Sequence, residues 1–142
     1  MISDANFYPR NMLKPACLLA MKAAVARFYR CNMRAYTPPV SRKQNATKAR
    51  TACCEALSRM FPDCRRYEIA AALGVEDSSV WGMFVMAGRL ERGRDCDKFR
   101  RAVEVAIRAY CEVDAARAIA HERVLAGCHL APSGEAVSSD GN

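Results

Sequence analysis

The chain has 142 residues, of which 51% are hydrophobic and 8% aromatic, and a formal net charge of +7. That length suits one domain whose core needs no disulfide or metal. No apolar run approaches the roughly 18 residues of a membrane span, and no signal-peptide pattern is visible, so a cytoplasmic protein is expected. Alanine and methionine are frequent and alternating patterns scarce, which predicts an all-α helical bundle.

The eight cysteines include no C-x2-C pair, and only His121 and His129 could assist them as ligands. A zinc site is therefore weakly supported. We predict reduced thiols that act mostly as small buried hydrophobic residues. No metal and no cofactor is expected.

Positive charge is concentrated in the first half of the chain. Residues 1–66 contain 13 Lys/Arg against 3 Asp/Glu, a balance of +10, whereas residues 67–142 contain 9 against 12, a balance of −3. This asymmetry points to a polyanionic partner for one face of the fold. A well-solvated surface is the alternative.

Taken in order, residues 1–12 are predicted to be a flexible N-terminus, residues 13–128 a helical domain, and residues 129–142 a disordered tail. Pro15 suits the first turn of a helix. We expect one long helix from there to Tyr36, ended by Thr37-Pro38-Pro39. Its predicted apolar stripe comprises Leu18, Met21, Val25 and Phe28.

A polar segment, SRKQNATKAR (41–50), follows and contains four cations and no acid. It is predicted to be a loop that joins the long helix to the next, at roughly Ala46–Phe61. A basic loop can follow a phosphate backbone or enter a minor groove, although a solvated connection fits equally well. The predicted core positions of the next helix are Ala49, Ala52, Cys53, Ala56, Leu57 and Met60.

Residues 65–90 have the pattern of a helix-turn-helix. The first helix is predicted at Arg66–Leu73, the turn at Gly74–Asp77, and the second helix begins at Ser78. Ala70 allows the helices to cross closely, and glycine tolerates the positive φ of the turn. The motif commonly places its second helix in the DNA major groove, although an ordinary αα-hairpin has similar spacing.

The second helix of this motif has two distinct faces. Asp77 or Ser78 is the expected N-cap. The inward stripe is predicted to be Val80, Met83, Phe84, Ala87 and Leu90, and the outward face Ser78, Trp81, Gly82, Val85, Met86 and Arg89. Serine hydroxyls can bind a base or a phosphate, but an apolar patch of Trp81, Val85 and Met86 is typical of a protein contact. Burial of Trp81 under the first long helix is the alternative.

After a connection at Gly93–Asp97, a last helix is expected to run to about Leu125, capped by Asp95 or Asp97. Its predicted core stripe is Phe99, Val103, Ala106, Ile107 and Tyr110, continued by Val113 and Ile119.

The order of these parts resembles that of a known family. VARFYR (Val25–Arg30), the basic segment, YEIAAALG (Tyr67–Gly74), EDSSV (Glu76–Val80) and Phe99-x3-Val103 follow one another as in the C-terminal DNA-binding domain of the bacterial replication initiator DnaA. The resemblance covers about residues 22–110. It implies that the basic loop enters a minor groove while the second helix of the motif reads the major groove.

Carried over by position, the resemblance assigns the loop role to the segment's four cations and the hydroxyl contacts to Ser78 and Ser79. Val85 and Met86 stand where the family has a basic pair, which implies weaker or less selective base reading. The chain has no phosphate-binding G-x4-G-K-[ST] loop.

The sequence therefore predicts a non-enzymatic DNA-binding regulator of replication initiation or transcription, nucleoid-associated, with double-stranded DNA as partner. No catalytic residues, nucleotide or membrane contact are expected. The predicted DNA-binding residues are Arg42, Lys43, Lys48, Arg50, Arg65, Arg66, Ser78, Ser79 and Arg89. The alternative is a protein-interaction module that binds replication proteins through Trp81, Val85 and Met86.

Overall fold

The computed structural model describes residues 13–130, and within that range it contains helices and no strand, as the sequence predicts. Its elements are α2 (Pro15–Phe28), the 3₁₀ helix η2 (Met33–Tyr36), α3 (Gln44–Met60), α4 (Arg66–Leu73), α5 (Asp77–Arg92) and α6 (Cys96–Leu130). The chain divides between Cys111 and Glu112 into two compact units. The predictions for residues 1–12 and 131–142 lie outside the described residues.

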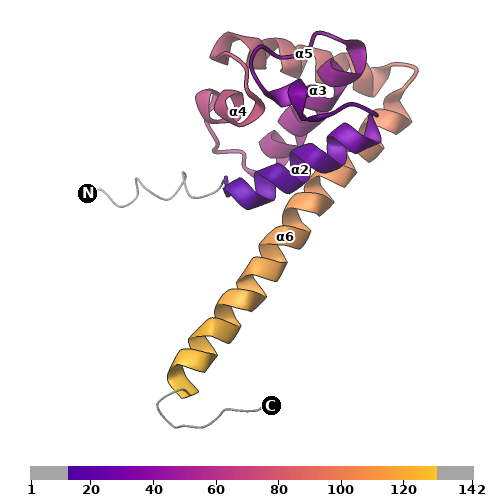
Figure 1. Cartoon of the computed structure of the whole chain (residues 1–142). Helices are drawn as coiled ribbons and strands as arrows, with labels where there is room; N and C mark the ends of the chain where they lie inside the picture. Colours follow the sequence, from indigo (N-terminus) through magenta and orange to yellow (C-terminus); the bar gives the residue numbers. More distant parts are fainter. Residues whose placement is uncertain (1–12, 131–142) are drawn as a thin grey trace. The chain divides into compact units, whose positions relative to one another are not determined.

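Helix α3 is the centre of the first unit. It packs against α2, η2, α4 and α5, and Figure 1 shows it between α2 and α5. Small side chains allow these close approaches. The predicted core positions of α3 are confirmed except Met60, which is half-buried. Its buried residues are Ala46, Ala49, Arg50, Thr51, Ala52, Cys53, Cys54, Ala56 and Leu57.

The prediction of one helix up to Tyr36 is wrong, because α2 ends at Phe28. The chain leaves it through a Schellman motif, in which Cys31 N–H donates to Ala26 O at 2.8 Å and Arg30 N–H donates to Arg27 O at 3.1 Å. Arg30 takes the left-handed position of that motif, with φ of 58°. Glycine usually occupies this position, so the sequence lacks the usual signal for the end of the helix.

Helix η2 is capped at its start and anchored to α2 at its end. The Asn32 side chain accepts a hydrogen bond from Arg34 N–H at 2.9 Å, and the Tyr36 hydroxyl donates to Lys22 O at 2.9 Å. The same hydroxyl lies 3.6 Å from Cys53 Sγ. Burial raises the pKa of the Cys53 thiol to about 12, so this thiol stays protonated at neutral pH. The segment that follows, residues 37–43, therefore starts from an anchored point.

Helix α4 has the predicted bounds, and Gly74 ends it with φ of 72°. The axes of α4 and α5 are bent by 90° at this turn. Helix α5 begins at Asp77, one residue earlier than predicted, and its N-cap is Glu76 rather than Asp77 or Ser78. The Glu76 side chain makes no capping hydrogen bond. The capping propensity of Asp77 and Ser78 is overridden because the short turn after Gly74 already brings Asp77 into the helix.

The first part of α6 completes the core of the first unit. Phe99, Val103, Ala106 and Tyr110 are buried as predicted, whereas Ile107 of the same predicted stripe is half-buried. The Tyr110 ring meets Phe61 edge-on with centroids 5.4 Å apart, and its hydroxyl accepts a hydrogen bond from Lys14 N–H at 2.9 Å. These contacts join the end of α3 and the start of α2 to α6.

In the second unit, α6 extends to Leu130, beyond the predicted end near Leu125. Residues 129 and 130 of the predicted tail therefore belong to a helix. The prediction that the core stripe continues to Ile119 is wrong, because this side chain is 50% exposed. An apolar residue at helical spacing is buried only where another element covers it.

Seven cysteines have described side chains, and they differ in burial. Cys17, Cys53 and Cys54 are buried, Cys31, Cys64 and Cys96 are half-buried, and Cys111 is exposed. The prediction that most of the cysteines are buried is therefore wrong for the described side chains. Burial also raises the pKa of Cys54 to about 12.

Candidate nucleic-acid interface

The predicted basic loop is shorter than expected. Helix α3 begins at Gln44, so Arg42 and Lys43 precede it while Lys48 and Arg50 lie within it. The prediction that all four cations lie in a loop is wrong. Gln44 and Asn45, which resemble loop residues locally, join the helix because its later turns are anchored in the core. We call residues 37–43 the 37–43 loop.

Arg50 is a buried structural residue with 7% of its surface exposed. Its guanidinium donates hydrogen bonds to Ala35 O at 2.8 Å, Ser41 O at 2.9 Å and Thr47 Oγ1 at 3.3 Å. Desolvation lowers the pKa of Arg50. The side chain therefore fixes both η2 and the 37–43 loop to α3, and three of the five guanidinium N–H donors are occupied within the chain.

Lys48 is also engaged, since its Nζ lies 3.5 Å from Asp95 Oδ2. Arg42 and Lys43 are exposed and form no ion pair with any residue in the range 13–130. Of the four predicted loop cations, these two have charges available to a partner.

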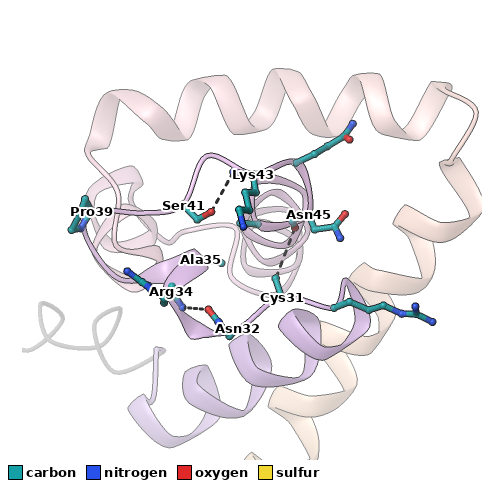
Figure 2. A pocket seen from close by; sticks show the side chains of 11 residues that line it. Cys31, Asn32, Arg34, Ala35, Pro39, Ser41, Lys43 and Asn45 are labelled. Carbon is teal, nitrogen blue, oxygen red and sulfur yellow. Dashed lines mark hydrogen bonds between the residues drawn. The ribbon is translucent and has the colours of Figure 1, made fainter.

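Two hollows flank the 37–43 loop and share Pro39 in their linings. We call the first the α3 pocket; it is a cavity of about 690 Å³ whose lining includes Lys43. Figure 2 shows Arg34, Ser41, Lys43 and Asn45 around the start of α3, viewed nearly along the helix axis. We call the second the Gly74 hollow; its volume is about 870 Å³ and its lining includes Arg42, Glu76 and Ser79.

The Gly74 hollow brings together Arg42 and Ser79, two predicted site residues that are 37 positions apart. The fold makes this approach possible at Gly74, because a Cβ there would overlap the carbonyl oxygen of Tyr36. The turn between α4 and α5 therefore lies directly against the end of η2. The start of α5 and the 37–43 loop meet at this contact.

Sequence reasoning missed two cations of this region, Arg30 and Arg34, which line the α3 pocket together with Lys43. Both are exposed, and neither forms an ion pair within the described part of the chain. The sequence predicts one helix through both positions, but α2 ends at Phe28. Asn32, a common helix N-cap residue, was the local signal that a new turn starts here.

Arg65 and Arg66 lie at the opposite end of α4 from Gly74, about 12 Å away at the helical rise per residue. Both are exposed and have no acidic partner among residues 13–130. The Glu68 carboxylate accepts a hydrogen bond from Arg65 N–H at 2.8 Å. This carboxylate offsets the unfavourable placement of two cations at a helix N-terminus.

The exposed face of α5 combines hydroxyl, apolar and basic side chains. Trp81 is 66% exposed and Val85 43% exposed, which rules out the alternative that Trp81 is buried under the first helix. Val80, Met83 and Ala87 of the predicted inward stripe are buried, while Phe84 and Leu90 are half-buried. The outward residues Ser78, Ser79 and Arg89 are exposed, and Met86 is half-buried.

Within the described residues, no group of three or more His, Cys, Asp or Glu side chains is arranged to hold a metal ion. No single described helix is long and apolar enough to cross a membrane, although the bent pair α4 and α5 reaches that length and composition when taken together. The chain matches no protein-family model, no curated protein and no solved structure.

Proposed function

We propose that the chain is a non-enzymatic regulator that binds duplex DNA and acts in replication initiation or transcription. In this proposal α4 and α5 form a helix-turn-helix, and the chain is a divergent relative of the C-terminal domain of the initiator DnaA. The 90° bend and the left-handed Gly74 support the first of these assignments.

One observation carries the proposal: the Gly74 hollow joins Arg42 of the 37–43 loop to Ser79 at the start of α5. Arg42 and Ser79 line the same concave surface. A cation can contact a phosphate, and a hydroxyl at the start of a helix can contact a base edge or a phosphate. A duplex contact needs both kinds of group at close range. Lys43 extends the positive surface on the other side of Pro39.

The partner in this proposal is recognised mainly through its phosphates. The exposed face of α5 offers Ser78, Ser79 and Arg89 to base edges or phosphates, but Glu76 and Asp77 at its start are acidic and exposed. These carboxylates repel a phosphate backbone. We therefore expect binding with modest sequence preference and a large electrostatic contribution.

The test is a mobility-shift titration of random and origin-derived duplexes across a salt series. If Arg30, Arg34, Arg42 and Lys43 neutralise four phosphates, the slope of log affinity against log salt is about −3.6. Affinity then falls by roughly 600-fold between about 50 and about 300 mM salt. Affinity that does not change with salt would contradict the proposal.

Paired variants localise the contact within the same titration. Arg42→Gln is expected to make the slope less negative by about 1, because one phosphate contact is lost. Arg59→Gln is the matched control, because this exposed arginine is already paired with Glu55 and Glu91 at 2.7 Å and should leave the slope unchanged. Equal slopes for Arg42→Gln and the wild type would remove Arg42 from the interface.

The exposed apolar residues of α5 favour a second candidate function, a module that binds replication proteins. Trp81 and Val85 lie one helical turn apart on the exposed face. Large exposed aromatic residues are enriched at protein interfaces, where Trp is a frequent anchor.

For this candidate, Trp81→Ala should abolish capture of a replication protein that the wild-type chain retains, with the salt slope on DNA unchanged. Leu19→Ala is the matched control, since Leu19 of α2 is 58% exposed and belongs to a different helix. Both substitutions are at exposed sites and should change the free energy of unfolding by no more than about 0.5 kcal/mol. Undiminished capture by Trp81→Ala would contradict this candidate.

A further inference from the structure

The α3 pocket is a concave site whose charge comes entirely from cations. Its lining includes Arg30, Arg34 and Lys43 and contains no Asp or Glu. Its volume of about 690 Å³ lies within the range of small-molecule sites. All three cations are exposed, and none forms an ion pair with any described residue. The pocket therefore has a positive potential that the rest of the described chain does not neutralise.

Neutral hydrogen-bond donors lie in the same lining as the cations. The Ser41 Oγ accepts a hydrogen bond from Lys43 N–H at 3.2 Å, so its own proton remains available for donation. Asn45 and Gln44 lie at the pocket and carry exposed amide side chains, each of which offers two N–H donors. An anion in the pocket would thus meet charged and neutral donors together.

The first turn of α3 adds to this positive end of the pocket. No side chain caps the helix and no acid lies in its first turn. The backbone N–H groups of Gln44, Asn45 and Ala46 have no acceptor in the described backbone. The partial positive charge at a helix N-terminus favours an anion at this position.

We propose that the α3 pocket binds a phosphate group. Guanidinium groups bind phosphate oxygens in pairs of parallel hydrogen bonds, and a lysine adds a point charge. The pocket offers both kinds of cation together with hydroxyl and amide donors in one lining. The phosphate is either a diester of a nucleic-acid backbone or the monoester of a small molecule.

The first measurement follows the backbone amide resonances of the full chain by NMR during titration with inorganic phosphate. Sodium chloride at matched ionic strength serves as the blank. We expect saturable shifts at Gln44, Asn45 and Ala46 with phosphate and none with chloride. Equal responses to the two salts would overturn the proposal.

Arg30→Gly separates binding from folding. Arg30 occupies a left-handed backbone position with φ of 58°, which glycine adopts without strain. The variant should therefore be at least as stable as the wild type, yet bind phosphate roughly threefold to tenfold more weakly, because one cation is lost. Lys43→Gln should weaken binding similarly, and Arg59→Gln, outside the pocket, should bind like the wild type. Unchanged affinity in both pocket variants would overturn the proposal.

Two further titrations distinguish the source of the phosphate. A nucleoside 5′-monophosphate that shifts the same amides more strongly than a short duplex identifies a small-molecule site, and the reverse result identifies a backbone contact. The pocket proposal shares Arg30, Arg34 and Lys43 with the proposed function, but the failures of the two are distinguishable. Phosphate binding without duplex binding would support the pocket proposal and contradict the DNA proposal. Duplex binding that leaves these three amides unshifted, with no response to phosphate, would contradict the pocket proposal and leave the DNA proposal standing.

Discussion

Replacing Gly74 by alanine is expected to lower the free energy of unfolding by about 2–5 kcal/mol. Gly74 has φ of 72°, and a left-handed backbone costs a residue with a Cβ about 1–2 kcal/mol. The added Cβ would also overlap the Tyr36 carbonyl oxygen, which belongs to the backbone and cannot rotate away. Relieving such overpacking costs typically about 1–3 kcal/mol more. Urea unfolding followed by circular dichroism measures the change.

Gly82→Ala is the matched control for this glycine. Gly82 lies within α5, and a Cβ there would meet no atom within 4 Å. Alanine is the better helix former, so this variant should be more stable by about 0.5–1 kcal/mol. A Gly74→Ala variant as stable as the wild type would mean that the α4–α5 turn does not contact η2 as described.

Replacing Arg50 by methionine is expected to lower the free energy of unfolding by about 2–4 kcal/mol, because Ala35 O and Ser41 O lose their donor. Each buried acceptor left unpaired costs about 1–3 kcal/mol. Arg50→Lys should recover only part of this loss, since an ammonium group cannot reproduce the planar fork that spans two carbonyls. Arg59→Met, at an exposed ion pair in the same helix, should cost less than about 1 kcal/mol.

Arg50 also links stability to the proposed function. Its hydrogen bond to Ser41 O fixes the 37–43 loop, which presents Arg42. In duplex titrations at a temperature where Arg50→Lys is fully folded, affinity should fall while the salt slope keeps its wild-type value, because the contacting cations remain present. A loss of slope equal to one phosphate contact would instead show that the Arg50 guanidinium itself reaches DNA.

Local signals were sufficient for the region around the turn. The bounds of α4 followed from a helical pattern that ends in glycine, and the buried positions Val80, Met83 and Ala87 followed from helical spacing. The buried face of α3 was predictable for the same reason. These features depend on the periodicity of apolar residues and on the glycine that ends α4, and both are recognisable from residues close together in the sequence.

The two chief errors in the first half of the chain have a common cause. The end of α2 has no glycine, because Arg30 takes the left-handed position within a Schellman motif. Arg50 has the local pattern of a surface cation, yet it is buried. Its guanidinium donates hydrogen bonds to backbone carbonyl oxygens 9 and 15 residues earlier in the chain. Neither outcome can be read from a residue and its immediate neighbours.

The sequence by itself determined that the chain is helical, where the α4–α5 turn lies and which faces of α3 and α5 are buried, because these depend on spacing along the chain. The tertiary structure decided which cations are available. It paired Lys48 with Asp95, enclosed Arg50 among carbonyls, and gathered Arg30, Arg34 and Lys43 around the start of α3. A charge is available to a partner only when no distant part of its own chain satisfies it, and that depends on contacts between residues far apart in the sequence.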